Sequence, residues 1–255
     1  MAKASASFTK QTPYAAGYYP AEAAGLAWLA AAGSGSVPVV GVRQVDEDEI
    51  VLDRLVSSTP TQTAAEDFGR GLAVTHVAGA AAFGQGPDGW TGDGFLGRQR
   101  LTLRPQATWG AFYAEQRLWP YAVQAHARHN LSPAGLRAVQ RVCERLVAGD
   151  FDDDRPPARI HGDLWSGNVV FTADGVVLID PAAHGGHGLT DLAMLHVFGA
   201  PDLDRISAAY AEEARVEPGW RDLIGLHQLH PLLVHAVSHG PAYGDEAASV
   251  ARRYR

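Results

Sequence analysis

Short strand-like runs dominate the first 55 residues of this chain, and helical spacing dominates the remainder. Phe8-Thr-Lys10 has the composition of a strand end, and residues 21–32 are alanine-rich with high helical propensity. Two further apolar runs, residues 37–40 and 49–53, are typical of strands and flank an acidic turn. The predicted order in this first part is therefore strand, helix, strand, strand.

Beyond residue 55 the apolar residues recur mainly at helical intervals. Residues 63–80 place Phe68, Leu72, Val74 and Val77 where they would share one buried face. The glycine-rich span 79–97 has no phosphate-loop spacing, and we assign it no nucleotide role. Further helices are expected over residues 109–119, 139–147 and 191–198 and around Ile206, Leu223 and Leu233. We predict an α+β chain with an N-terminal lobe (1–55) and a mainly helical C-terminal lobe (56–255).

A polar loop and a hairpin interrupt the helical part. Residues 158–160 lead into the loop His-Gly-Asp-Leu-Trp-Ser-Gly-Asn, and residues 169–171 leave it as a β-rich run. A turn and the apolar residues 176–179 follow, which predicts a hairpin. Since Asn168 precedes the first strand of this hairpin and Asp180 follows the second, both side chains are expected at the same end.

Three oxygen-bearing side chains in this segment have the spacing of a phosphotransferase site. Asp163 precedes Asn168 by five residues, and Asp180 follows twelve residues later, as in the catalytic loop and metal-binding Asp of protein kinases. Asp163 is suited to accept a proton from a hydroxyl nucleophile, whereas Asn168 and Asp180 are hard oxygen ligands suited to Mg²⁺. Each alone could simply cap a turn. Together they favour phosphoryl transfer from ATP.

The loop resembles that of the fructosamine kinase (ketosamine kinase) family, a branch of the aminoglycoside-phosphotransferase-like kinases. Leu164-Trp-Ser-Gly167 is the part that separates this family from other small-molecule kinases. The resemblance covers nearly the whole chain, with departures at residues 183–184 and 188–189. It implies a two-lobed protein-kinase-like fold, ATP and Mg²⁺ as cofactors, and a ketosamine as the small-molecule substrate. Its further matches are Asp180-Pro-Ala182, Gly186-His187, Asp191-Leu-Ala-Met194, Phe198-Gly199 and Pro218-Gly-Trp220.

The same resemblance implies a set of nucleotide-binding residues. Lys10 looks like the family's nucleotide lysine, and Glu22 looks like its helical partner. Asp53 and Leu55 lie at the hinge, where backbone groups of such kinases receive adenine. Only nine residues precede Lys10, whereas this fold places two strands and a phosphate-covering loop before that lysine. We therefore expect a shortened N-terminal β lobe.

Two residues are candidates for contact with the substrate. Trp165 could form an apolar wall for a sugar or face a protonated amine. Alternatively, its ring could pack beneath the loop. His187, from the Gly186-His187 match, is the second candidate. Three hypotheses follow: phosphorylation of a ketosamine hydroxyl, phosphorylation of an aminoglycoside or another amino-sugar, and a non-catalytic pseudokinase that binds a nucleotide or ligand.

Composition narrows the cellular context. The 255 residues are 46% hydrophobic with a net charge of −7, and they contain neither a run of eighteen apolar residues nor a basic block. We therefore expect no membrane span and no nucleic-acid partner. Cys143, the only cysteine, lies in a helical pattern as a core thiol, and no secretory signal precedes it. A cytoplasmic location is expected, and the oligomeric state is left open.

Overall fold

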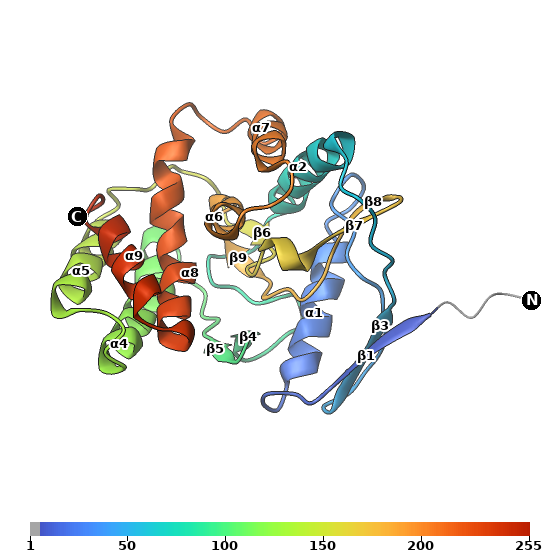
Figure 1. The fold of residues 1–255 in the computed structure, drawn as a ribbon, viewed down its shortest axis with the longest axis horizontal. Coiled ribbons are helices and arrows are strands. Elements are labelled where there is room, and N and C mark those ends of the chain that lie inside the picture. Colours follow the sequence, from blue (N-terminus) through green and yellow to red (C-terminus); the bar gives the residue numbers. More distant parts are fainter. Residues whose placement is uncertain (1–5) are drawn as a thin grey trace, which may run out of the picture.

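The computed structural model describes residues 6–255, in which a small β-sheet with one helix stands beside a larger helical part (Figure 1). The sheet is antiparallel with the strand order β1-β3-β2, and Lys10 of β1 pairs with Ile50 of β3. Helix α1 covers the sheet, and Tyr19 and Leu26 of this helix share a small core with Ile50 and Leu52. The elements are β1 (Ser7–Gln11), α1 (Tyr18–Ala30), β2 (Val42–Val45) and β3 (Glu49–Asp53).

The expected strand over residues 37–40 is wrong. Val37 and Val40 are buried, but within this run only Val39 pairs with a strand, through one isolated parallel bridge to Leu178. Pro38 has no N–H to donate, so the run cannot continue a ladder and instead connects the small sheet to the hairpin behind it. The strand of the sheet is β2, which starts at Val42.

The larger part is built from helices, as the spacing of apolar residues predicted. In α2, Thr61 caps the N-terminus by accepting a hydrogen bond from Ala64 N, and Phe68 and Leu72 are buried. Val77 is 78% exposed, so its predicted burial is wrong; it occupies the last position of the helix. Cys143 lies in the buried face of α5 as expected. The helices are α2 (Gln62–Val77), α3 (Trp109–Phe112), a π-helical turn (Tyr113–Leu118), α4 (Trp119–Ala127), α5 (Pro133–Val147), α6 (Leu189–Phe198), α7 (Leu203–Glu213), α8 (Ile224–His239) and α9 (Pro241–Ala251).

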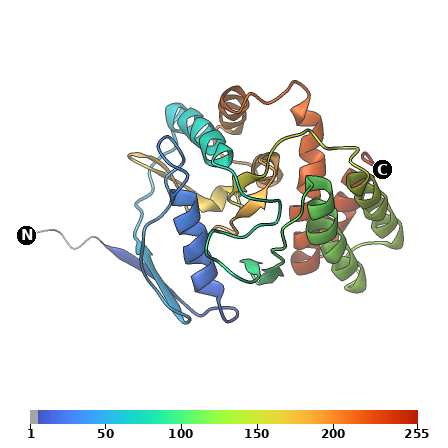
Figure 2. The same ribbon diagram turned by 180° about the vertical axis from the view of Figure 1, so that it is seen from behind.

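Three two-stranded ladders lie near the junction of the two parts (Figures 1 and 2). The predicted hairpin is confirmed as β7–β8, and the strand before the polar loop is β6, which pairs with β9. The third ladder is the hairpin β4–β5, which lies within and just beyond the glycine-rich span and packs near α1. Their bounds are β4 (Gly94–Leu96), β5 (Gln99–Leu101), β6 (Ala158–Ile160), β7 (Val169–Thr172), β8 (Gly175–Leu178) and β9 (His184–Gly186).

No helix within residues 6–255 combines the length and the apolar character that crossing a membrane requires.

Candidate active site

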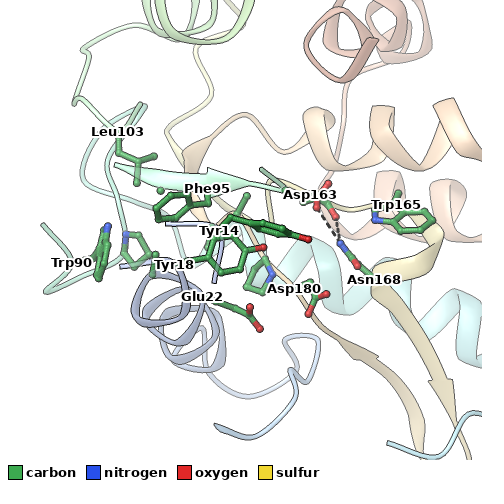
Figure 3. A pocket seen from close by; sticks show the side chains of 17 residues that line it. Tyr14, Tyr18, Glu22, Trp90, Phe95, Leu103, Asp163, Trp165, Asn168 and Asp180 are labelled. Atoms are coloured by element: carbon green, nitrogen blue, oxygen red, sulfur yellow. Dashed lines mark hydrogen bonds between the residues drawn. The ribbon is translucent and has the colours of Figure 1, made fainter. Parts of the chain in front are cut away.

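The loop between β6 and β7 brings Asp163 and Asn168 together. The Asn168 carboxamide donates a hydrogen bond to the Asp163 carbonyl oxygen at 2.8 Å and approaches the Asp163 carboxylate at 3.4 Å. Asp180 follows β8 with a left-handed φ of 55°, and the preceding residue, Ile179, donates its N–H to the Asn168 carbonyl oxygen. All three side chains border one pocket, as the hairpin predicted, and Figure 3 shows them around its rim.

A buried carboxylate from α6 holds the loop in this shape. Asp191 accepts hydrogen bonds from His161 N at 2.7 Å and Gly162 N at 2.9 Å, and His76 Nε2 donates to it at 3.0 Å. Burial would raise the pKa of Asp191, but the hydrogen bond and charge of His76 and the Gly162 N–H hold it below its usual value. His161 donates from Nε2 to the Ile179 carbonyl oxygen, and its burial lowers its pKa. Its ring therefore supports the loop as a neutral imidazole.

Asp163 has the electrostatics of a proton acceptor. Desolvation and, to a smaller extent, the negative charge of Asp180 raise its pKa to about 7, although the Asn168 hydrogen bond opposes the shift. A carboxyl group with this pKa can exchange a proton near neutral pH, which an ordinary aspartate cannot do efficiently.

Lys10 reaches the same region from the small sheet. Its ammonium lies 2.7 Å from Glu22 of α1 and 2.5 Å from Asp180. Burial lowers the pKa of Lys10, but the two carboxylates more than offset this effect, so the pKa is raised overall. The predicted Lys10–Glu22 contact is therefore present, and the lysine also contacts Asp180.

Three pockets meet around these residues. The aromatic pocket, of about 240 Å³, lies between Asp163 and the rings of Tyr14, Tyr18, Trp90 and Phe95 (Figure 3). Its polar side carries Asn168, Asp180 and Glu22. Because the rings and the acids face one cavity, this pocket suits a polar molecule that also has a cationic or apolar part.

The hinge pocket, of about 460 Å³, lies on the other side of Asp180. Phe8, Leu52 and Leu55 give it an apolar lining, and Lys10 and Asp53 also border it. The Asp53 carboxylate pairs with Arg43 at 2.7 Å. A flat apolar ring system would fit between these walls, with Lys10 and Asp180 at its inner end.

The helical pocket, of about 350 Å³, lies between the polar loop and α8. Asp163 and Trp165 border it together with Phe198, His235 and His239. Trp165 is 42% exposed and meets Phe198 edge to face, so it does not pack beneath the loop. Asp163 and Trp165 also border the aromatic pocket, so they form the wall between the two cavities.

His187 does not reach any of these three pockets. It is only 4% exposed, it donates from Nε2 to Asp153 at 3.0 Å, and its ring packs against Trp109 and His227. The residue follows β9 on the side of α3, away from Asp163. In the structure His187 therefore packs against Trp109 and His227 and lines neither pocket that Asp163 borders, so its predicted contact with the substrate gains no support.

The glycine-rich span contributes residues that the sequence did not single out. Trp90, Phe95 and Gly97 all border the aromatic pocket. The available signal is three large aromatic residues, Phe83, Trp90 and Phe95, within an otherwise small and polar segment, and two of them line the pocket. The span lacks the spacing of a phosphate-binding loop and instead forms part of the wall opposite Asp163 (Figure 3).

The comparisons of this chain with known proteins all indicate the same family. A family model described as fructosamine kinase matches residues 3–254. A "Probable ketoamine kinase" of Lactiplantibacillus plantarum is 31% identical over 238 residues, which is 93% of this chain and 82% of the relative. A "Probable ketoamine kinase" of Thermus thermophilus is 32% identical over 228 residues, covering 89% and 79% of the two chains.

Solved structures agree with these relatives. The crystal structure of a "putative fructosamine-3-kinase" from Thermobifida fusca has a TM-score of 0.89 and 45% identity, covering 97% of this chain and 85% of that one. The gentamicin complex of the phosphotransferase APH(2")-IIa has a TM-score of 0.63 at 10% identity, covering 97% and 87%, which shows a shared fold. The predicted protein-kinase-like α+β fold is thereby confirmed.

Proposed function

This chain belongs to the fructosamine kinase family, and from that premise we propose that it transfers the γ-phosphoryl group of ATP to a hydroxyl of a ketosamine. The observation that carries the proposal is the position of Asp163. Its carboxyl group, with a pKa of about 7, borders the same pocket as Asn168 and Asp180. That pocket adjoins the hinge pocket through Asp180.

Asn168 and Asp180 fit a magnesium ion. The Asn168 NH₂ group is turned to Asp163, so its carbonyl oxygen is left as a possible ligand. The Asp180 carboxylate is 42% exposed toward the pockets, and its neighbour Lys10 is a flexible ammonium that can move to a phosphate. Two protein oxygens are a usual number for Mg²⁺ bound with a nucleotide, since phosphate oxygens and water complete its octahedron. Bound there, the ion would neutralise charge on the phosphates.

The hinge pocket would receive the nucleotide. Phe8 and Leu52 would enclose the adenine, and backbone groups near Asp53 and Leu55 would provide its hydrogen bonds. Lys10 stands at the inner end of this pocket, where it would contact the phosphates while Glu22 keeps the ammonium in place. Asp53, paired with Arg43, contributes through its backbone.

Asp163 would act on the acceptor. As the hydroxyl oxygen forms its bond to the γ-phosphorus and the bond from that phosphorus to ADP breaks, Asp163 takes the hydroxyl proton. Trp165, beside it, offers an exposed ring to the sugar or its amine. The relatives named ketoamine kinase support a ketosamine as the acceptor, whereas aminoglycoside phosphotransferases share the fold alone.

A turnover assay with three acceptor conditions tests the proposal. The protein is incubated with Mg·ATP and a fructosamine, an aminoglycoside or no acceptor, and ADP and the phosphorylated product are measured. We expect a phosphorylated fructosamine and only background ADP in the other two reactions. Nucleotide binding by calorimetry without product in any reaction would contradict the proposal and favour a pseudokinase. Product with the aminoglycoside alone would contradict the assigned acceptor.

A further inference from the structure

The β4–β5 hairpin stands where the aromatic and helical pockets meet. Phe95 of β4 borders the aromatic pocket, Gln99 of β5 borders the helical pocket, and Gly97 in the turn borders both. Asp163 and Trp165 border the same two cavities from the other side. A molecule with a hydroxyl at Asp163 therefore has the hairpin turn beside it, whichever of the two cavities its remaining part enters.

Two arginines of this hairpin rest on aromatic rings of the pocket. The guanidinium of Arg98, next to Gly97 in the turn, lies 4.9 Å from the centre of the Tyr14 ring. The guanidinium of Arg100 lies 6.0 Å from the centre of the Phe95 ring. Both arginines are exposed. A guanidinium stacked on a ring keeps its orientation while the N–H groups at its edge stay available for an anion.

Within residues 6–255, neither Arg98 nor Arg100 forms an ion pair with a carboxylate. Arg104, a few residues later, is instead paired with Asp93 at 2.9 Å. The pocket floor carries negative groups, among them Asp163, Asp180 and Glu22. The lining of the pocket is therefore acidic and aromatic, and the two arginines, which are not part of that lining, stack on two of its rings and form a cationic rim, in a chain whose net charge is −7.

This distribution of charge fits a zwitterionic acceptor. A ketosamine made from a free amino acid has a secondary ammonium beside the sugar and a carboxylate a few bonds further on. The ammonium would lie among the rings and acids of the interior, and the carboxylate would lie at the rim. A ketosamine of an uncharged or cationic amine would leave the rim arginines without an anion.

On the basis of the proposed function, we propose that Arg98, assisted by Arg100, binds a carboxylate on the amine substituent of the acceptor. The enzyme then selects ketosamines of free amino acids. Arg98 is a specificity-determining residue: it touches the part of the substrate that does not react. Its removal changes which ketosamine is preferred and leaves the transfer step intact.

The test compares two acceptors of nearly equal size, the ketosamines of glycine and of glycinamide, of which only the first carries the carboxylate. The ratio of their kcat/KM values is measured for the unaltered chain, for Arg98→Ala and for Arg98→Ala combined with Arg100→Ala. Arg137→Ala is the matched control because Arg137 is also exposed but lies on α5, far from the hairpin in Figure 1. Thermal melting shows whether each variant is folded.

We expect the unaltered chain and Arg137→Ala to prefer the glycine ketosamine by about tenfold, as for a hydrogen-bonded charged pair. This preference should fall in Arg98→Ala and disappear in the double variant, while kcat/KM for the glycinamide ketosamine stays the same. Arg98→Glu should reverse the preference. Equal use of both acceptors by the unaltered chain, or a preference that survives in the folded double variant, would overturn the inference while the proposed function stands. Transfer to neither acceptor would overturn the proposed function and this inference with it.

Discussion

Lys10 and Asp180 lie 170 residues apart in the sequence, and the Lys10 ammonium is 2.5 Å from an Asp180 carboxylate oxygen. The lysine also contacts Glu22, which is only 7% exposed. One ammonium thus joins the small sheet, helix α1 and the end of the β7–β8 hairpin. Lys10, the proposed phosphate ligand, and Asp180, a proposed metal ligand, therefore neutralise each other in this state. When Mg·ATP binds, the Lys10–Asp180 pair would be replaced by contacts of Lys10 with phosphate and of Asp180 with the metal ion.

Replacing Lys10 should therefore weaken nucleotide binding. Lys10→Met removes the lysine ammonium that lines the hinge pocket and leaves the Glu22 and Asp180 carboxylates without it, which repels phosphates. We expect the Kd for Mg·ATP, measured by calorimetry, to rise at least about tenfold, as for the loss of one charged hydrogen bond. The control is Arg137→Met, which removes an exposed cation on α5 that does not line the hinge pocket. An unchanged Kd in Lys10→Met would contradict the assignment.

Asp163 should make stability depend on pH. Its pKa is raised from 3.8 to about 7 on folding, so the folded state keeps a proton that the unfolded state has lost in this range. As the pH rises from 4 to 7, the free energy of unfolding of the unaltered chain should therefore fall relative to that of Asp163→Asn. Above pH 7 the difference between the two values should stay constant. Because the side chain opens on a pocket, we expect only about 1–2 kcal/mol in the free energy of unfolding. A difference between the unaltered chain and Asp163→Asn that is independent of pH would refute the raised pKa of Asp163.

Asp191 should be required for the shape of the loop. Asp191→Asn removes a buried charge that accepts hydrogen bonds from His161 N, Gly162 N and His76. We expect a loss of about 3 kcal/mol in the free energy of unfolding measured in urea at pH 7. Since the pKa of Asp191 is lowered on folding, this contribution is present above pH 4 and is lost as the pH falls through the lower, folded value. A loss below about 0.5 kcal/mol, within the range of ordinary surface substitutions, would show that the loop keeps its conformation without the Asp191 carboxylate.

Gly167 allows Trp165 to take its observed place. A Cβ atom at position 167 would lie 2.3 Å from the Trp165 ring, so Gly167→Ala must displace the indole. We expect a higher KM for the acceptor with little change in the Kd for Mg·ATP. The check is a double-mutant cycle: Gly167→Ala should add nothing in a Trp165→Ala background. Fully additive effects would mean that the glycine acts on the loop backbone and not through the indole.

Sequence reasoning was most successful where one local pattern fixes the geometry. The hairpin 169–178 brings Asn168, just before it, and Asp180, just after it, to the same end, so their proximity follows from strand periodicity and one turn. The spacing to Asp163 could be matched to a known loop in the same way. For residues 37–40, by contrast, the apolar β-rich run indicated burial correctly but indicated strand pairing wrongly, because Pro38 prevents a ladder.

The pocket walls were harder to predict because distant segments form them. His187 is part of a sequence match, but in the structure its ring contacts Trp109 and Asp153. The three-residue strand β9 that precedes it is too short for its periodicity to reveal that direction. Trp90 lies in an irregular segment, and Phe95 lies in the short strand β4 and contacts Tyr18 of α1, so the positions of both depend on tertiary packing. Such residues become recognisable only when the tertiary structure brings them opposite Asp163.

The most direct test of phosphoryl transfer at this site is the turnover of Asp163→Asn with Mg·ATP and a fructosamine. Asparagine keeps the size of the side chain but cannot accept the hydroxyl proton, so we expect kcat to fall by about 10²- to 10⁴-fold. Far-UV circular dichroism and the Kd for Mg·ATP should stay close to those of the unaltered chain, and Asp174→Asn should retain full turnover. A folded Asp163→Asn variant that phosphorylates the fructosamine at the unaltered rate would contradict the proposed role of Asp163.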